Sequence, residues 1–346
     1  MSKATVLILT EATDAHAQPV QVALRRHGVQ VVRAALSSLP GQLALTAWLG
    51  KRDEPRSPAS SPCWEGTLWL EGEPLALAEL RSLWWRRPGR IQAPAAYPAP
   101  IARVIERETR RGLLGLLYSQ TGWAASPPAL WVSPPEAIER AEYKPLQLAT
   151  AQAVGLRVPR TLLTTDPAAV QTFFEACEGQ VVCKALARGV VEWPEGSAAY
   201  LYTSAVQASD LAALGGVQVM PHLLQERLPA ACALRVVVIG RQLFAVEIHP
   251  PATEPAVLDW RRAYSQLRYE LHSLPKQVQT QLLKLTQLLG LQFSSLDLLL
   301  TPEGEYVYLE QNPNGQWYWL EERLGARLPL AEAMARLLAH PEEEAL

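Results

Sequence analysis

The sequence has few cysteines, and none has the spacing of a zinc site or a redox motif. Its four cysteines, Cys63, Cys177, Cys183 and Cys232, form no CxxC pair and have no companion histidine cluster, which such sites require. HExxH, GxSxG, GxGxxG and GxxxxGK[ST] are also absent, which removes the usual signs of zincins, α/β-hydrolases, Rossmann enzymes and P-loop enzymes. We therefore expect reduced, structural thiols and a phosphate site that is not a Walker loop.

The chain also lacks an excess of charge and a long apolar run. Lys and Arg number 32 against 34 Asp and Glu, a formal net charge of −2, so no global positive field gathers nucleic acid or an anionic membrane. The apolar run at residues 6–9 is too short for a signal-peptide core, and no stretch approaches the roughly 18 apolar residues of a membrane span. We expect a cytoplasmic protein whose partner is a small molecule or a peptide.

Length and patterning indicate more than one domain. The chain has 346 residues, 49% of them hydrophobic, so it can bury a large interior and exceeds one typical core. It opens as strand, helix and strand, and a Pro-rich stretch at residues 126–135 indicates a boundary. Residues 50–62 combine charge, Pro and Ser, as in a surface loop. Further helices are expected at 101–118, 144–153 and after 167, and strands at 83–86, 161–164 and 180–185.

The segment before and after residue 300 gives the clearest indication of chemistry. Apolar residues at helical spacing, followed by Gly290, predict a helix over residues 275–290. Two β-rich runs, 291–301 and 305–311, flank a Pro-Glu-Gly turn, which predicts an antiparallel hairpin centred on Glu303 and Gly304.

A hairpin with that centre pairs Asp297 with Glu310 and places Asn312 on the same face, because strand side chains alternate. Facing carboxylates repel each other, and Asp297 stands in an apolar run where an unpaired charge is costly. Two carboxylates and an amide are hard oxygen ligands that suit Mg²⁺. The alternative is a solvated hairpin with incidental acidic residues.

Four basic residues are candidates for binding an anion. Lys184 ends the apolar run VVCKAL, where an anionic ligand or a snorkelling side chain would explain it. Lys144 precedes a helical run and reads, taken alone, as a surface lysine. Arg235, at the start of a predicted strand, and Arg261 could each clamp a phosphate with their guanidinium groups, or form a surface salt bridge.

Several segments together resemble the ATP-grasp superfamily and, more closely, the microviridin-type graspetide ligases, which crosslink side chains of ribosomal precursor peptides. The resemblance covers nearly the whole chain, and DWR with NPNGQW at this separation is its most specific part. It rests on LWWRRPG, EYKPLQLATAQAVGLRVPRTLLTTDP, LLQERLPAACALRVVVIGRQLFAVEIHP, LDWR and FSSLDLLLTPEGEYVYLEQNPNGQWYWLE.

The resemblance implies an α/β and α+β architecture, the ATP-grasp fold, with a pre-ATP-grasp α/β domain (1–128), a central lobe (129–224) and a C-terminal lobe with the metal site (225–346). It implies ATP and Mg²⁺ as cofactors, a precursor peptide with a leader segment as partner, and a homodimer. For the nucleotide it implies phosphate binding by Lys144 and Lys184 and an adenine-binding linker with Gln225, Glu226 and Leu228. For the reaction it implies Mg²⁺ binding by Asp297, Glu310 and Asn312, and stabilisation of the transferring phosphate by Arg235 and Arg261. For the peptide it implies leader binding in loop 190–202 by Glu192, Trp193 and Glu195.

The implied reaction activates a substrate carboxylate as an acyl phosphate and joins it to a hydroxyl or an amine, without a covalent enzyme nucleophile. Three alternatives remain open from the sequence. The chain could ligate free amino acids or protein tails, it could bind nucleotide without turnover, or it could be a structural scaffold. A precursor encoded nearby, ADP release and measurable ATP binding would distinguish them.

Overall fold

The computed structural model describes residues 4–49, 64–121, 125, 127–187, 189–193, 195–251 and 258–346, apart from the side chain of Glu192. Within these ranges no helix has both the length and the apolar character needed to cross a membrane. The surface loop expected at 50–62 and Cys63 lie outside the described residues. Cys177, Cys183 and Cys232 are free thiols, as expected.

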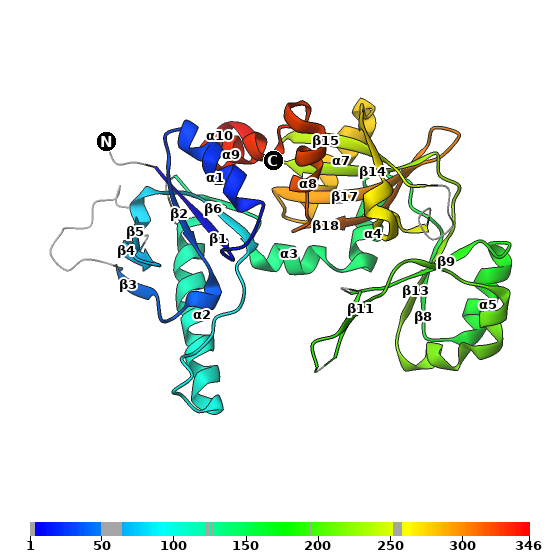
Figure 1. Ribbon diagram of the computed structural model, residues 1–346, viewed down its shortest axis with the longest axis horizontal. Helices are drawn as coiled ribbons and strands as arrows, with labels where there is room; N and C mark the ends of the chain where they lie inside the picture. The colour runs from blue at the N-terminus through cyan, green and yellow to red at the C-terminus, as the bar shows by residue number, and fades with distance from the viewer. Residues whose placement is uncertain are drawn as a thin grey trace.

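The N-terminal part is a parallel sheet of order β2-β1-β6-β7, flanked by a small antiparallel sheet of order β3-β4-β5 (Figure 1). The predicted strand-helix-strand opening is confirmed. β1 is fully apolar in its middle and buried throughout, as expected of a strand covered on both faces. The elements are β1 (Thr5–Thr10), α1 (Ala17–Arg26), β2 (Gln30–Ala34), β3 (Leu43–Trp48), β4 (Glu65–Leu70), β5 (Glu73–Ala76), β6 (Leu80–Arg87), α2 (Ala99–Thr121) and β7 (Leu130–Val132).

The middle of the chain forms a smaller sheet of order β12-β9-β13-β8, covered by α5, with the hairpin β10-β11 projecting beside it (Figure 1). Its own small core contains Val170, Val181 and Leu224. The elements are α3 (Pro135–Ala141), α4 (Lys144–Ala153), β8 (Thr161–Thr164), α5 (Pro167–Ala176), β9 (Val181–Lys184), β10 (Val190–Glu192), β11 (Ala198–Tyr200), β12 (Ser204–Ala205) and β13 (His222–Glu226).

The C-terminal part is an antiparallel sheet of order β16-β15-β14-β17-β18. Leu282 and Leu285 of α7 belong to the apolar cluster that also contains Leu296 and Leu298 of the sheet. The elements are β14 (Cys232–Ile239), β15 (Gln242–His249), the short helix η4 (Trp260–Gln266), β16 (Arg268–His272), α7 (Lys276–Leu288), β17 (Phe293–Leu300), β18 (Tyr306–Asn312), α8 (Tyr318–Leu324), α9 (Leu330–Ala339) and α10 (Pro341–Glu344).

The N-terminal and C-terminal parts share their core. Helix α9 returns to the N-terminal sheet and packs against α1 and β6 (Figure 1). One apolar cluster therefore combines Ile8 and Trp84 of the N-terminal sheet with Leu337 of α9 and Val237 of β14. The segment that follows β18 lies at this junction.

The hairpin register confirms the pairing of Asp297 with Glu310, but the turn was placed wrongly. Nearer the turn, Leu298 faces Tyr308 rather than Leu309, so the pairing there is shifted by one residue from the prediction. A bulge in β18 leaves Leu309 without a facing residue and corrects the register before Glu310. Arg235 also lies inside β14 rather than at its start.

Candidate active site

One cavity of about 260 Å³ opens where the β14–β18 sheet meets the end of β9 and the start of η4. The sequence-predicted residues that it brings together are Lys144, Lys184, Arg235, Arg261, Asp297, Glu310 and Asn312. With Arg87 and Asp259, the lining contains five cationic and three anionic side chains. This imbalance favours an anionic ligand that carries more than one charge.

Two of the three carboxylates of the cavity, Asp297 and Glu310, face each other across β17 and β18. Asp297 accepts two hydrogen bonds from Arg235, at 2.8 Å to each carboxylate oxygen, because Arg235 is its direct neighbour on β14. Burial nevertheless raises the pKa of Asp297, and the adjacent Glu310 adds to this effect. Arg235 therefore compensates only part of the cost of a buried charge at Asp297.

Glu310 is held in its ionised form by lysines. It forms an ion pair with Lys144, which begins α4. Burial alone would raise its pKa, but Lys144 and Lys184 outweigh burial and lower the pKa of Glu310 to about 2. Asp297, Glu310 and Asn312 thus offer two carboxylates and an amide on one face, and the charge at Asp297 is incompletely compensated. This donor set fits a hard divalent cation such as Mg²⁺.

Lys184 ends β9 and reaches the same cavity. Burial lowers the pKa of its ammonium group to about 8, and the charge of Lys144 adds to that shift, while Glu310 opposes it. A second anion beside Lys184 would restore its usual charge preference. The position therefore fits the phosphate contact expected from the sequence.

Arg261 is oriented by its neighbour two residues earlier. Its Nε and Nη2 donate to the two carboxylate oxygens of Asp259 at 2.7 and 2.6 Å, and these bonds raise the pKa of Arg261. The Arg261 side chain remains 46% exposed beside the cavity, so it can still contact a ligand. Trp260 and Trp319 lie at 5.8 Å between ring centroids and form an aromatic wall.

The loop after β18 is held from the N-terminal sheet, which the sequence did not indicate. Arg86 is fully buried, and its Nη1 donates to the carbonyl oxygens of Asn314 and Gly315 at 2.7 Å each. The side chain of Asn314 donates back to the carbonyl of Arg86. A Cβ at Gly315 would lie 2.7 Å from Cβ of Ser295, so this close approach requires glycine.

A histidine contact reinforces that loop. The Trp317 backbone N–H donates to Nε2 of His16 at 3.1 Å, which leaves Nδ1 to donate to Asp14 at 3.1 Å. Burial is the main reason that the pKa of His16 is lowered. The neutral imidazole is therefore the form that makes the contact with Trp317.

Gln147 is another supporting residue that the sequence did not single out. It lies one turn after Lys144 on α4 and is 2% exposed. Its amide oxygen accepts from the Gln311 N–H at 3.0 Å, and its Nε2 donates to the Gln311 carbonyl at 3.0 Å. Gln147 thus occupies the place of a neighbouring strand beside β18, between Glu310 and Asn312.

The expected adenine-binding residues do not line this cavity. Gln225 is buried in β13 and donates to Thr161 at 3.1 Å. Glu226 forms a bidentate ion pair with Arg160 at 3.0 Å. Neither these two nor Leu228 is among the lining residues that the structure describes, so their nucleotide role stays a prediction.

The expected leader-binding segment, residues 190–202, contains the antiparallel hairpin β10-β11. Val190 pairs with Tyr200 and Glu192 with Ala198. Trp193 at its tip is 44% exposed, and Tyr200 is 63% exposed, while Glu195 accepts a hydrogen bond from Ser197 at 2.7 Å. The hairpin offers exposed aromatic surface, and its binding role stays a prediction.

No protein-family model matches the chain, and no curated protein does either. Solved structures do. The macrocyclase MdnC of Microcystis aeruginosa MRC, bound with precursor peptide MdnA, is 26% identical over 97% of this chain and 99% of its own, with a TM-score of 0.76. The macrocyclase MdnB of the same organism is 29% identical over 98% and 100%, with a TM-score of 0.72.

A Chryseobacterium gregarium RiPP-associated ATP-grasp ligase, solved with ADP and a leader and core peptide, is 23% identical over 97% of both chains, with a TM-score of 0.82. The expected mixed α/β architecture is confirmed by these likenesses, which extend along nearly the whole chain. The chain therefore has the fold of these macrocyclases and of the RiPP-associated ATP-grasp ligase, and it gathers lysines, arginines and carboxylates around one cavity.

Proposed function

We propose that the chain is an ATP-dependent ligase that forms ester or amide crosslinks within a ribosomal precursor peptide. The observation that carries the proposal is the convergence of Asp297 and Glu310 with five cationic side chains on one cavity, in a fold similar along its length to macrocyclases. ATP and Mg²⁺ are the proposed cofactors. Related ligases were solved with ADP, AMPPNP or Mg.

In this proposal Asp297, Glu310 and Asn312 hold Mg²⁺, which when bound supplies positive charge to the nucleotide phosphates. Lys144 and Lys184 bind phosphate oxygens. Lys144 can exchange part of its ion pair with Glu310 for this contact, because both groups line the same cavity. Gln225, Glu226 and Leu228 are proposed to border the adenine.

An Asp or Glu side chain of the peptide attacks the γ-phosphate, which gives an acyl phosphate and ADP. A hydroxyl or amine of the same peptide then attacks the acyl carbon and displaces phosphate. Arg235 and Arg261 stabilise the charge of the transferring group, and their carboxylate partners Asp297 and Asp259 hold them in place before substrate binds. Each completed bond removes one water from the peptide.

The hairpin β10-β11 is the proposed contact for a leader segment. Trp193 provides an exposed apolar anchor, and the sequence adds Glu192 and Glu195 as the proposed anionic contacts. Binding the peptide away from its reacting side chains raises their effective concentration at the cavity, so one site can form several bonds in turn.

Further details are part of the same proposal. The substrate class is that of the microviridin-type enzymes, the protein acts in the cytoplasm, and it forms a homodimer. We propose domain limits at 1–128, 129–224 and 225–346, although α4 packs on β18 and α7 and so joins the central segment to the C-terminal sheet.

A ligase for free amino acids is the second candidate. The D-cycloserine synthetase DcsG has a similar fold, with a TM-score of 0.54 and 14% identity over 97% of this chain, so the fold alone also serves small molecules. The exposed aromatic hairpin favours the peptide.

Mass spectrometry tests the choice. A candidate peptide rich in Asp, Glu, Ser, Thr or Lys and encoded nearby is incubated with the protein, ATP and Mg²⁺. The proposal expects loss of one or more waters from the peptide. Deleting the leader, or Trp193→Ala, should reduce this processing much more than ATP binding. Equal processing of leaderless core peptide or of free amino acids would support the amino-acid ligase instead.

A further inference from the structure

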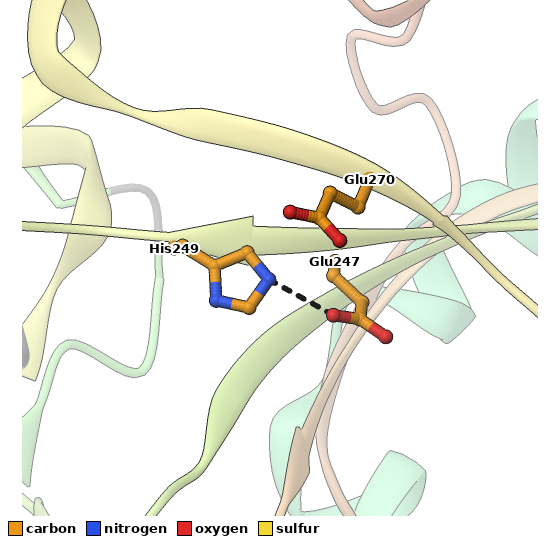
Figure 2. Close-up of side chains that lie close together, drawn as sticks. All are labelled: Glu247, His249 and Glu270. Carbon is orange, nitrogen blue, oxygen red and sulfur yellow. Dashed lines mark hydrogen bonds and ion pairs between the residues drawn. The ribbon is translucent and has the colours of Figure 1, made fainter.

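A second group of polar residues lies on the opposite face of the C-terminal sheet, on β15 and β16. Val246 shares the cavity face with Arg235, its partner on β14, so Glu247 points to the other side. Glu247 and Glu270 are directly opposite each other. His249 follows Glu247 on the same face (Figure 2). None of these residues takes part in the proposed reaction.

Two facing glutamates repel each other unless a cation lies between them. In Figure 2 the side chains of Glu247, His249 and Glu270 lie together, and one ligand atom from each lies within 4.8 Å of the others. The closest pair, Glu247 Oε2 and His249 Nε2, is separated by 2.9 Å. Around a metal with bonds of about 2.1 Å, neighbouring ligand atoms are about 3.4 Å apart. A metal would therefore replace the proton between Glu247 and His249 and separate that pair slightly, and the exposed Glu270 side chain would complete the set.

A separate observation supports a ligand role for Glu247. Its other carboxylate oxygen, Oε1, accepts from Nδ1 of His272 at 2.7 Å, and Nε2 of His272 is 2.8 Å from the Tyr306 hydroxyl. This chain of bonds orients the carboxylate so that Oε2 remains directed at His249. The bond from His272 also lowers the pKa of Glu247, although burial opposes it. Outer hydrogen bonds of this kind orient ligands at metal sites.

We propose that Glu247, His249 and Glu270 bind one divalent transition-metal ion of the zinc type. An imidazole with two carboxylates suits zinc, whereas Mg²⁺ prefers oxygen ligands and retains its waters. The ion would join the end of β15 to the start of β16. These strands flank residues 250–267, which include Asp259 and Arg261 of the cavity. Metal binding would therefore fix both ends of a segment whose described residues 258–261 and Tyr264 line the cavity.

A charged residue beside the proposed site, and a pair of histidines elsewhere in the chain, provide the control variants. Arg268 faces His249 across the strands, so its positive charge lies on the face of the proposed site, and Arg268→Gln should leave zinc binding intact or tighten it. Nδ1 of His27 lies 3.3 Å from Nε2 of His340, and Nε2 of His27 lies 2.8 Å from Oε1 of Glu332. These two histidines with a glutamate are the matched control for zinc binding at His249. His27→Gln should leave zinc binding unchanged.

Isothermal titration calorimetry with ZnCl₂, without nucleotide, tests the proposal, and metal analysis after dialysis gives the stoichiometry. We expect one equivalent of zinc, affinity at least tenfold weaker in His249→Gln and in Glu270→Gln, and affinity about 10–100-fold weaker in His272→Asn, which loses the bond that orients Glu247. Asp297→Asn, which alters the other carboxylate site, should bind zinc as the unchanged protein does.

A second measurement follows the thermal unfolding midpoint. Zinc should raise the midpoint of the unchanged protein and of Asp297→Asn, and should not raise that of His249→Gln. Absence of zinc binding, equal binding by His249→Gln, or loss of binding in Asp297→Asn or His27→Gln would each overturn the proposal. None of these readouts depends on turnover, so the proposed ligase function can fail while the zinc site stands.

Discussion

Gln147→Leu tests whether a residue that takes no part in the reaction positions the active-site strand β18. Gln147 touches no substrate in the proposed reaction, yet its amide makes hydrogen bonds to Ala141, Tyr308 and both backbone groups of Gln311. Leucine has similar volume and removes all of them. A buried polar group that is left without a hydrogen bond costs ~1–3 kcal/mol. The backbone N–H and C=O of Gln311 would both lose their partner, which predicts a loss of about 4 kcal/mol in the free energy of unfolding.

The same change should loosen β18 where it carries Glu310 and Asn312. We expect the Mg²⁺ concentration for half-maximal ADP release to rise at least tenfold, equivalent to about 1.4 kcal/mol. Urea unfolding and initial rates at varied Mg²⁺ give the two quantities. Gln152→Leu on the exposed side of the same helix is the control and should change neither. If Gln147→Leu cost under 1 kcal/mol and left the Mg²⁺ dependence unaltered, the claim that this side chain positions β18 would be refuted.

Four further predictions follow from the geometry. Asp297→Asn and Glu310→Gln should each lose Mg²⁺-dependent ADP release while circular dichroism shows the fold retained; normal activity in either contradicts the metal assignment. Arg86→Met should lower stability by ~3–5 kcal/mol, because it removes the cation beside the partly buried Asp14 and leaves two loop carbonyls without their donor; a loss below 1 kcal/mol in urea unfolding would count against the Arg86 contact. Gln311→Leu should raise stability by ~1–3 kcal/mol, since both side-chain amide atoms are buried without a partner in the described part of the chain; no gain in the melting temperature would mean that they are satisfied. Burial lowers the pKa of His16 from 6.5, so the unfolded chain binds the proton more readily, and the stability of the fold falls as pH drops below about 6.5. His16→Gln should therefore flatten the pH dependence of the melting temperature. An identical slope in His16→Gln would disprove this contribution of His16.

Local patterns predicted much of the fold and the centre of the site. The helix α4 and strand β8 have the predicted limits, because their apolar spacing and flanking residues are local properties. The pairing of Asp297 with Glu310 was also correct, but it depended on two compensating features. The turn is shifted by one residue, and the bulge at Leu309 shifts the register back. A bulge has no strong sequence signal, so the pairing could have been missed by one residue.

The contacts that support the site could not be predicted in this way. Arg86 and Asn314 are far apart in the sequence, and their mutual bonds depend on how α9 and β6 pack the two ends of the chain together. Gln147 reads as an ordinary polar residue on a helix surface until α4 lies against the edge of β18. Such long-range arrangements leave no periodicity in either segment.

The central claim is that the Asp297–Glu310 cavity uses ATP to form bonds within a peptide. The most direct measurement follows ADP release and the peptide mass in the same reaction with a candidate precursor, ATP and Mg²⁺. We expect one ADP for each water lost from the peptide, and neither product with Asp297→Asn. ADP release without any loss of peptide mass, or peptide crosslinking that persists in Asp297→Asn, would contradict it.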